Sequence, residues 1–333
     1  MCVKLCVRLQ ICLALALGFC SGFSSPALAF KVGLVLDKGG KDDKSFNSAA
    51  YAGATQAEKD LKIELKYVEA TDNTATENLH RSFAKKNFDL IIGVGFAQIE
   101  AVKKVSAQFP TVHFALVDGE LSLPNVKSLL FEEHEGSFLV GAIAAWTSKT
   151  AKVGFVGGMD IPLIRRFAMG YAAGAKHANS KIQLSENYVG VTNEAWNNPT
   201  KAKELALSQF GAGVDVIFVA AGASGSGVFD AAEEQKKYAI GVDSNQNWMK
   251  PGVILTSMLK RVDLAVFETI RQAQAGQFKA GVVRAGLKDK GIDYSVDQYN
   301  EKILPAGIRQ KVEDLKKQIL AGKITVPDYY TKK

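Results

Sequence analysis

The chain has no cysteine after position 20. All four of its cysteines lie near the amino terminus, at Cys2, Cys6, Cys12 and Cys20. A mature chain that begins after these positions has no thiol, which excludes disulfides, zinc thiolate sites and thiol catalysis.

Histidine is almost as scarce. The four histidines are His80, His113, His134 and His177. They lack the spacing of metal ligands, and no Ser, His and Asp arrangement stands out. We therefore expect no metal, no cofactor and no enzymatic activity. The alternative is a secreted nucleoside hydrolase or glycosidase, in which paired carboxylates would carry out catalysis.

No apolar run is long enough to span a membrane. Lys4 and Arg8 precede a short apolar stretch, and residues 27–29 read Ala-Leu-Ala. These features predict a cleaved secretory signal peptide over residues 1–29, whereas a span needs about 20 apolar residues. A lipoprotein signal needs a small residue before its cysteine, but Phe19 precedes Cys20. We therefore expect a periplasmic protein without a lipid anchor, and a lipoprotein is the alternative.

The excess of positive charge is small. The whole chain has 41 Lys and Arg against 34 Asp and Glu, and without Lys4 and Arg8 the balance of 39 to 34 leaves a net charge of +5. The basic residues are interspersed with acids, so we expect no nucleic-acid partner.

Strand-length apolar runs alternate with helix-period segments along the mature chain. The predicted strands are residues 31–36, 63–69, 89–94, 112–117, 126–130, 152–156, 182–189, 214–219, 238–242, 253–257 and 281–285. The predicted helices are residues 45–61, 74–87, 98–108, 163–178, 200–210, 226–236, 262–275 and 308–321. This alternation predicts an α/β protein with two doubly wound parallel-sheet lobes. No Pro- or Ser-rich linker separates them, so we expect a hinge of several short crossings.

Three acids stand at the ends of predicted strands: Asp37, Asp118 and Asp243. Open α/β sheets bind ligands at the carboxyl ends of their strands, and a carboxylate can accept hydrogen bonds from two vicinal hydroxyls. Each acid could instead serve a turn or a helix cap. Three together favour a sugar-binding site. Lys260 ends another strand and can balance an acid, although a solvated surface lysine is the alternative.

Aromatic and amide side chains accompany these acids. Phe46 and Asn47 begin a helix for which Ser45 is the candidate cap, and Trp196 lies in a polar loop of the second half. Phe46 and Trp196 can stack on a flat ligand, or they can pack on their own lobes. Asn47 offers both a donor and an acceptor to a heteroaromatic edge.

The segment 220–229, "AAGASGSGVF", joins a strand to a helix with small residues. Such residues let the backbone approach a ligand closely. The segment matches neither a phosphate-binding loop nor a hydrolase elbow.

Six ordered motifs resemble those of the basic membrane protein family. They are "DKGGKDDKSFN", "VGFVGGMDIPLIRRFAMGY", "AWNNPTKAKELA", "AAGASGSGVF", "GVDSNQ" and "LTSMLKRVD", and the resemblance covers residues 31–330. The family comprises substrate-binding proteins of ABC transporters, among them purine nucleoside receptors. The resemblance implies a type I periplasmic-binding-protein fold with three crossings. We place the N-terminal lobe at residues 30–132 and 259–286, and the C-terminal lobe at 133–258 and 287–333.

The resemblance also implies a ligand set. It places Asp243 and Lys260 on ribose hydroxyls, and Asp118 and Asn47 on the base. Asp37 adds a polar contact from the first lobe, and Phe46 and Trp196 stack on the base. Gly222 lets the chain pass close to the ligand, and Phe167 is a rival for the second aromatic wall.

The resemblance implies a monomeric receptor that captures a nucleoside, most simply a purine nucleoside, and delivers it to an ABC permease. A receptor of the same fold for a monosaccharide or another small solute is the alternative. The departures from the family pattern are Phe19, which spoils the lipoprotein signal, and the Gly-Ala-Ser-Gly-Ser-Gly order in residues 222–227.

Overall fold

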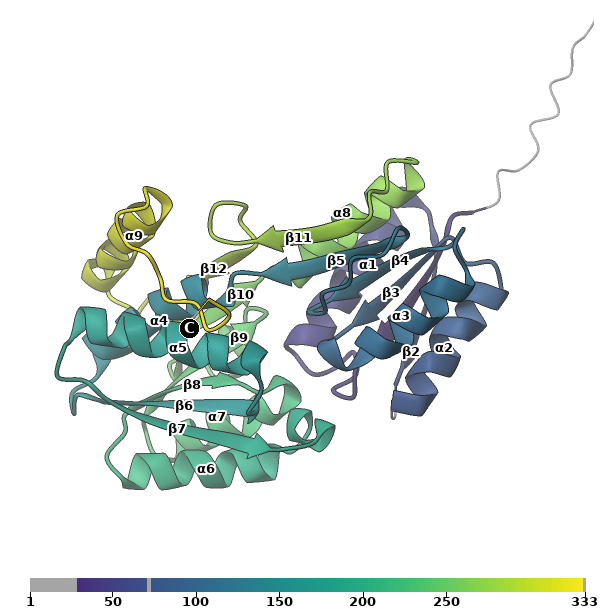
Figure 1. The fold of residues 1–333 in the computed structure, drawn as a ribbon. Coiled ribbons are helices and arrows are strands. Elements are labelled where there is room, and N and C mark those ends of the chain that lie inside the picture. The colour runs from purple at the N-terminus through teal and green to yellow at the C-terminus, as the bar shows by residue number, and fades with distance from the viewer. Residues whose placement is uncertain (1–28, 71–72, 332–333) are drawn as a thin grey trace, which may run out of the picture.

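The computed structural model describes residues 29–70 and 73–331. The predicted signal peptide lies outside the described residues except for Ala29. Within them the chain forms two lobes, each built on one six-stranded sheet (Figure 1).

The first sheet has the strand order β11-β5-β4-β3-β1-β2, and all its neighbouring strands are parallel. Its strands are β1 (Lys31–Leu36), β2 (Glu64–Glu69), β3 (Leu90–Val94), β4 (His113–Val117), β5 (Val126–Phe131) and β11 (Gly281–Ala285). Its helices are α1 (Phe46–Leu61), α2 (Asn73–Lys85), α3 (Ile99–Gln108) and α8 (Val262–Gln274). α1 packs on α8, and α2 packs on α3.

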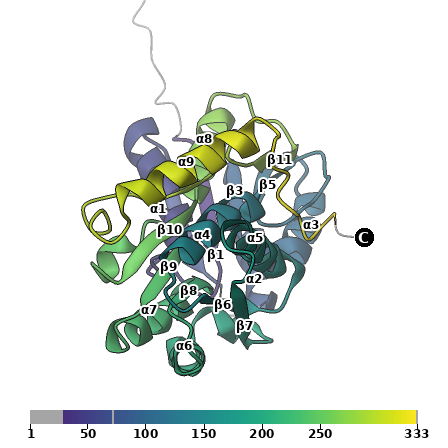
Figure 2. The same cartoon turned by 90° about the vertical axis from the view of Figure 1, so that its left-hand side faces the viewer.

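The second sheet has the order β12-β10-β9-β8-β6-β7. Its strands are β6 (Lys152–Met159), β7 (Gln183–Gly190), β8 (Val216–Ala220), β9 (Tyr238–Asp243), β10 (Ile254–Lys260) and β12 (Ile292–Tyr294). Its helices are α4 (Glu133–Thr147), α5 (Pro162–Ala178), α6 (Pro199–Gly211), α7 (Gly225–Glu234) and α9 (Ala306–Leu320). α9 packs on α4 at the side of the molecule that faces the viewer in Figure 2.

Two elements differ from the sequence prediction. Helix α4 was not predicted, because it is buried nearly all round and so lacks an amphipathic pattern. Its backbone touches α5 so closely that a Cβ on Gly174 would lie 1.9 Å from the carbonyl oxygen of Phe138. Strand β12 was also missed, and it pairs antiparallel with β10 although a parallel sheet was predicted. It has three residues, too few for a recognisable pattern.

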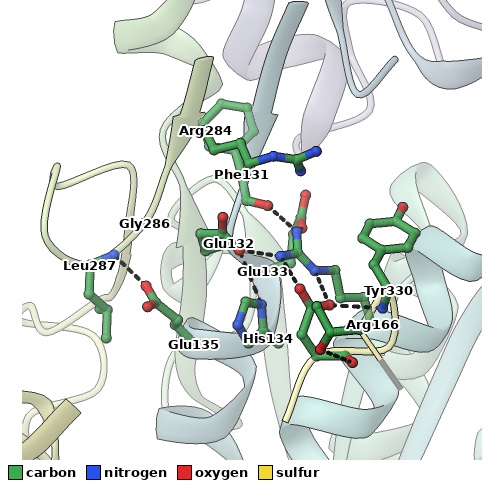
Figure 3. Close-up of polar contacts among 12 residues, drawn as sticks. Phe131, Glu132, Glu133, His134, Glu135, Arg166, Arg284, Gly286, Leu287 and Tyr330 are labelled. Carbon is green, nitrogen blue, oxygen red and sulfur yellow. Dashed lines mark hydrogen bonds and ion pairs between the residues drawn. The ribbon is translucent and has the colours of Figure 1, made fainter. Parts of the chain in front are cut away.

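The chain passes between the sheets three times, after β5, after β10 and after β11. The first and third crossings are tied together, since Glu132 N donates to Ala285 O at 3.0 Å and Leu287 N donates to Glu135 Oε2 at 2.7 Å (Figure 3). Strand β10 continues in the second sheet to Lys260, and the exact lobe boundaries given above stay predictions.

Candidate functional site

A cavity lies where the carboxyl ends of the two sheets face each other. The space between its walls, including the opening to solvent, is about 590 Å³. All nine residues singled out from the sequence line it: Asp37, Phe46, Asn47, Asp118, Phe167, Trp196, Gly222, Asp243 and Lys260. Their contact with a ligand stays a prediction.

The amino end of α1 forms the first-lobe wall. Ser45 occupies the cap position of α1, as predicted, but its side chain makes no capping hydrogen bond. Asp43 accepts from the backbone N–H groups of Ser45, Asn47 and Ser48 at 2.8, 2.8 and 2.9 Å. Ser45 Oγ instead donates across the cleft to Asp243 Oδ2 at 2.6 Å. Asp43 was not predicted as the capping side chain. Asp and Ser both suit a cap, and Ser45 lies nearer than Asp43 to the first residue of α1.

Asn47 and Asp37 are held together within this wall. Asn47 Oδ1 accepts from the backbone N–H of Asp37 at 2.8 Å, and Asn47 Nδ2 donates to Asp43 Oδ2 at 3.0 Å. Each end of the amide keeps capacity for one further hydrogen bond. Burial raises the pKa of Asp37, against a hydrogen bond from the backbone of Lys38.

Lys260 forms the charged centre of the cavity. Its Nζ lies 2.5 Å from Asp118 Oδ2 and 3.0 Å from Glu133 Oε1, and its side chain is 1% exposed. The rings of Phe46, Phe131 and Phe167 surround Nζ at centroid distances of 5.2, 5.1 and 5.6 Å. Burial alone would lower the pKa of Lys260, but the neighbouring carboxylates outweigh it and the pKa is raised. The ammonium therefore stays charged.

Asp243 is buried, the side chain of Asp118 is 6% exposed, and both residues adopt the left-handed backbone region, with φ of 63° and 61°. Asp tolerates this region better than most residues do. Burial raises the pKa of Asp243 to about 7, against the opposing effects of Lys260 and the Ser45 hydroxyl. Burial likewise raises the pKa of Asp118 to about 6, against Lys260.

Two buried polar atoms of the cavity residues have no hydrogen-bond partner within the described part of the chain. They are Asp118 Oδ1 and Trp196 Nε1. Buried polar atoms in native proteins are nearly always paired. A bound ligand that donates to Asp118 and accepts from Trp196 would satisfy both.

Aromatic rings enter the cavity from both lobes. Trp196 is the last residue of the short helix η2 (Asn193–Trp196). Its ring lies so close to the backbone of Gly158 that a Cβ there would be 2.1 Å from a ring atom. Phe96 of the first lobe meets Trp196 edge-on at a centroid distance of 6.3 Å. Phe96 was missed, although it follows the end of β3 as Asp118 follows β4. The same strand-end argument could have found it.

Gly222 has a backbone requirement of its own. Its φ is +56°, and a Cβ there would lie 3.3 Å from the carbonyl oxygen of Trp196. Glycine therefore lets this loop pass next to the aromatic wall.

Hydrogen bonds close the cleft between the lobes. Besides the Ser45 to Asp243 bond, Ser244 Oγ donates to Ser45 O at 2.9 Å and Gln246 Nε2 donates to Lys44 O at 3.0 Å. Lys38 and Glu194 form an ion pair across the rim. The structure is therefore the closed form of the two lobes.

One group of described residues outside the cavity could offer metal ligands: Glu132, His134 and Asp328, whose donor atoms lie within 4.8 Å of one another. Arg166 already bonds both carboxylates, which leaves their oxygens engaged. Burial and the nearby Arg166 lower the pKa of His134.

A family model described as "ABC transporter substrate-binding protein PnrA-like" matches residues 30–329. The chain belongs to this Bmp family. A relative named "ABC transporter nucleoside-binding protein BmpA", from Lactococcus lactis subsp. cremoris, is 33% identical over 320 residues, covering 89% of each chain. An uncharacterized lipoprotein of Pyrococcus horikoshii is 34% identical over 307 residues, covering 86% of this chain and 74% of that protein.

A similar fold is seen in a crystal structure of an ABC transporter solute-binding protein from Aeropyrum pernix K1. It superposes with a TM-score of 0.82 at 30% identity and covers 89% of this chain and 94% of that one. The family assignment and the type I periplasmic-binding-protein fold predicted from the sequence are thus confirmed. Bmp proteins are substrate-binding proteins rather than enzymes. Among the described residues, no helix is long and apolar enough to cross a membrane.

Proposed function

We propose that this chain captures a nucleoside, most simply a purine nucleoside, between its lobes and delivers it to an ABC permease. The observation that carries the proposal is one closed cavity that combines strand-end carboxylates with aromatic rings from both lobes. The Lactococcus relative, which is named as nucleoside-binding, supports it. We propose that this chain performs no catalysis and acts as a monomer.

Side chains from both lobes would contact the ligand. We assign Asp243 and Lys260 to the ribose hydroxyls, since Asp243 keeps one carboxylate oxygen beyond the one that accepts from Ser45. Asp118 and Asn47 would hold the base edge, with Asp37 as a further polar contact. Phe46 and Trp196 would stack on the base, and stacking of this kind is worth about 1–3 kcal/mol per base. Phe167 remains the rival to Trp196 for the second wall, and Gly222 makes room.

Tryptophan fluorescence tests the assignment of the cavity. Trp196 is one of three tryptophans in the chain, and it is the one that lines the cavity. We expect inosine and adenosine to change the emission of the wild type, and this change to disappear in Trp196→Phe. A change produced by ribose and by no nucleoside would favour the sugar-receptor alternative. Release of free ribose from a bound nucleoside would favour the hydrolase.

The charge of the cavity predicts that phosphorylated nucleosides are rejected. Four carboxylates line it, those of Asp37, Asp43, Asp118 and Asp243, and Lys260 is the one cation among the lining residues. Placing like charges together in a closed interface costs several kcal/mol. We expect inosine 5′-monophosphate to bind at least about 100-fold more weakly than inosine. Competition calorimetry measures this ratio, and equal affinities would contradict the assigned charge balance.

For localisation, we propose export to the periplasm by a signal peptide cleaved before Phe30. The family includes a lipoprotein, so anchoring through Cys20 is the alternative. Intact mass spectrometry of the protein purified from cells distinguishes the two. A chain that begins at Phe30 supports the proposal, and a diacylglycerol-modified Cys20 overturns it.

A further inference from the structure

The carboxyl-terminal segment ends at the hinge, far in sequence from the cavity. Figure 1 shows the chain leaving α9 and ending beside α5. Val326 is buried in the core shared with α4 and α9. Asp328 accepts two hydrogen bonds from the guanidinium of Arg166 on α5, Nε to Oδ1 at 2.7 Å and Nη2 to Oδ2 at 2.8 Å. The ring of Tyr330 lies 5.0 Å from Arg166 Cζ. The end of the chain is therefore attached to one buried side chain.

Arg166 joins this segment to the first crossing between the lobes. Its guanidinium is 2% exposed, and it donates to Phe131 O and to the carboxylates of Glu132 and Glu133 (Figure 3). The bond to Glu133 Oε2 is 2.8 Å long. One cation thus holds the last residue of β5, the first residue of α4 and Asp328 in a single arrangement.

Glu133 is shared between Arg166 and the cavity. Its Oε2 bonds Arg166, and its Oε1 lies 3.0 Å from Lys260 Nζ, which in turn bonds Asp118 at 2.5 Å. All four side chains are at most 6% exposed, so solvent screens their interactions little. A continuous chain of charges therefore runs from Asp328, which is 16% exposed, through the buried Arg166, Glu133 and Lys260 to the cavity.

We propose that Asp328 and Arg166 are positioning residues of the binding cavity, acting on Lys260 through Glu133. Lys260 stands between two anions, Asp118 on the cavity side and Glu133 on the hinge side. The position of its ammonium depends on how strongly each anion attracts it. Asp328 takes part of the hydrogen-bonding capacity of Arg166. When Asp328 is neutral, Arg166 turns toward Glu133, the hold of Glu133 on Lys260 weakens, and the ammonium moves. The carboxyl-terminal segment thereby sets the geometry of the ribose contact, and this last step rests on the proposed function.

The alternative is that the segment stabilises only the C-terminal lobe. In that case a neutral Asp328 would lower the free energy of unfolding and leave the cavity unchanged. A readout at Lys260 itself is therefore needed, since stability alone does not separate the two cases.

The test compares Asp328→Asn with Asp314→Asn, a matched control on α9 whose carboxylate is 53% exposed. The first readout is the ammonium signal of Lys260 in the ligand-free protein with ¹⁵N-labelled lysine, assigned by its absence from Lys260→Arg. We expect a protected signal in the wild type that moves or is lost in Asp328→Asn and is unchanged in Asp314→Asn. An unchanged signal in both variants overturns the proposal.

The second readout is calorimetric affinity for inosine. We expect Asp328→Asn to weaken binding about tenfold, in the range usual for coupling between separate sites, and Asp314→Asn to leave it unchanged. Equal affinity of Asp328→Asn and the wild type overturns the role in ligand positioning. The wild type could bind no inosine while the ammonium signal still responds to Asp328→Asn. In that case the positioning of Lys260 by Asp328 is supported, and the proposed nucleoside function fails.

Discussion

Asp243→Asn is expected to weaken nucleoside binding by about 100-fold at pH 8. The substitution keeps the shape of the side chain but removes the charge that receives the ribose hydroxyls, and hydrogen bonds to charged groups contribute about 1.5–3 kcal/mol each. In calorimetry, the loss should appear for every nucleoside that the wild type binds. Asp230→Asn, at a carboxylate that is 52% exposed, serves as the control and should bind normally.

The same variant should change the ligand-free shape. Burial raises the pKa of Asp243 to about 7 in the closed form. In the open form this carboxyl has a pKa nearer the ordinary value of 3.8, so closure requires uptake of a proton between that pH and about 7. Over this range each pH unit disfavours closure by about 1.4 kcal/mol, and above about 7 the penalty stays constant. The wild type should therefore open as the pH rises from 5 to 7, and Asp243→Asn should not. Small-angle scattering measures this difference. We expect the wild type to have a larger radius of gyration than Asp243→Asn at pH 8. Unchanged affinity and unchanged radius in Asp243→Asn would show that this carboxylate lies outside the functional site.

Lys260→Met is expected to lower the free energy of unfolding by about 3–5 kcal/mol at pH 8, because it leaves buried carboxylates without their cation. Two of the carboxyls that act on Lys260 are Asp118 and Asp243, and burial raises their pKa values to about 6 and about 7. Loss of Lys260 raises both pKa values further. At pH 5 both acids are then protonated, and the destabilisation should shrink to about 1 kcal/mol or less.

Urea unfolding of the ligand-free protein at pH 8 and at pH 5 measures this difference. Lys302→Met, at an exposed lysine, is the control and should behave like the wild type at both pH values. A loss of stability in Lys260→Met that is the same at both pH values would contradict the charge balance assigned to the cavity.

The residues that line the cavity could be predicted from the sequence better than the contacts at the hinge could, for a physical reason. In parallel sheets the residue after each strand lies at one edge, so Asp37, Asp118 and Asp243 could be brought together without knowing any tertiary contact. The capping role of Asp43 was not predicted, because several polar residues near α1 could serve as the cap. Helix α4 escaped because a helix that packs on all sides shows no periodicity.

The chain of charges from Asp328 to Lys260 was not predicted, for a different reason. Glu133, Arg166 and Asp328 each look like an ordinary surface charge in their own segments, and Lys260 was predicted only as a strand-end ligand contact. Arg166 directly precedes Phe167, and of these two residues only Phe167 was predicted to contact the ligand. Burial of paired charges depends on how the crossings pack, which local sequence does not specify.

The most direct test of the central claim is calorimetric titration of the mature protein from Phe30 onward, unfolded and refolded beforehand to remove any ligand carried from the cell. The titrants are adenosine, guanosine, inosine, uridine, adenine and ribose. We expect saturable heat with purine nucleosides and none with ribose. Heat with ribose or another sugar, and none with any nucleoside, would contradict it.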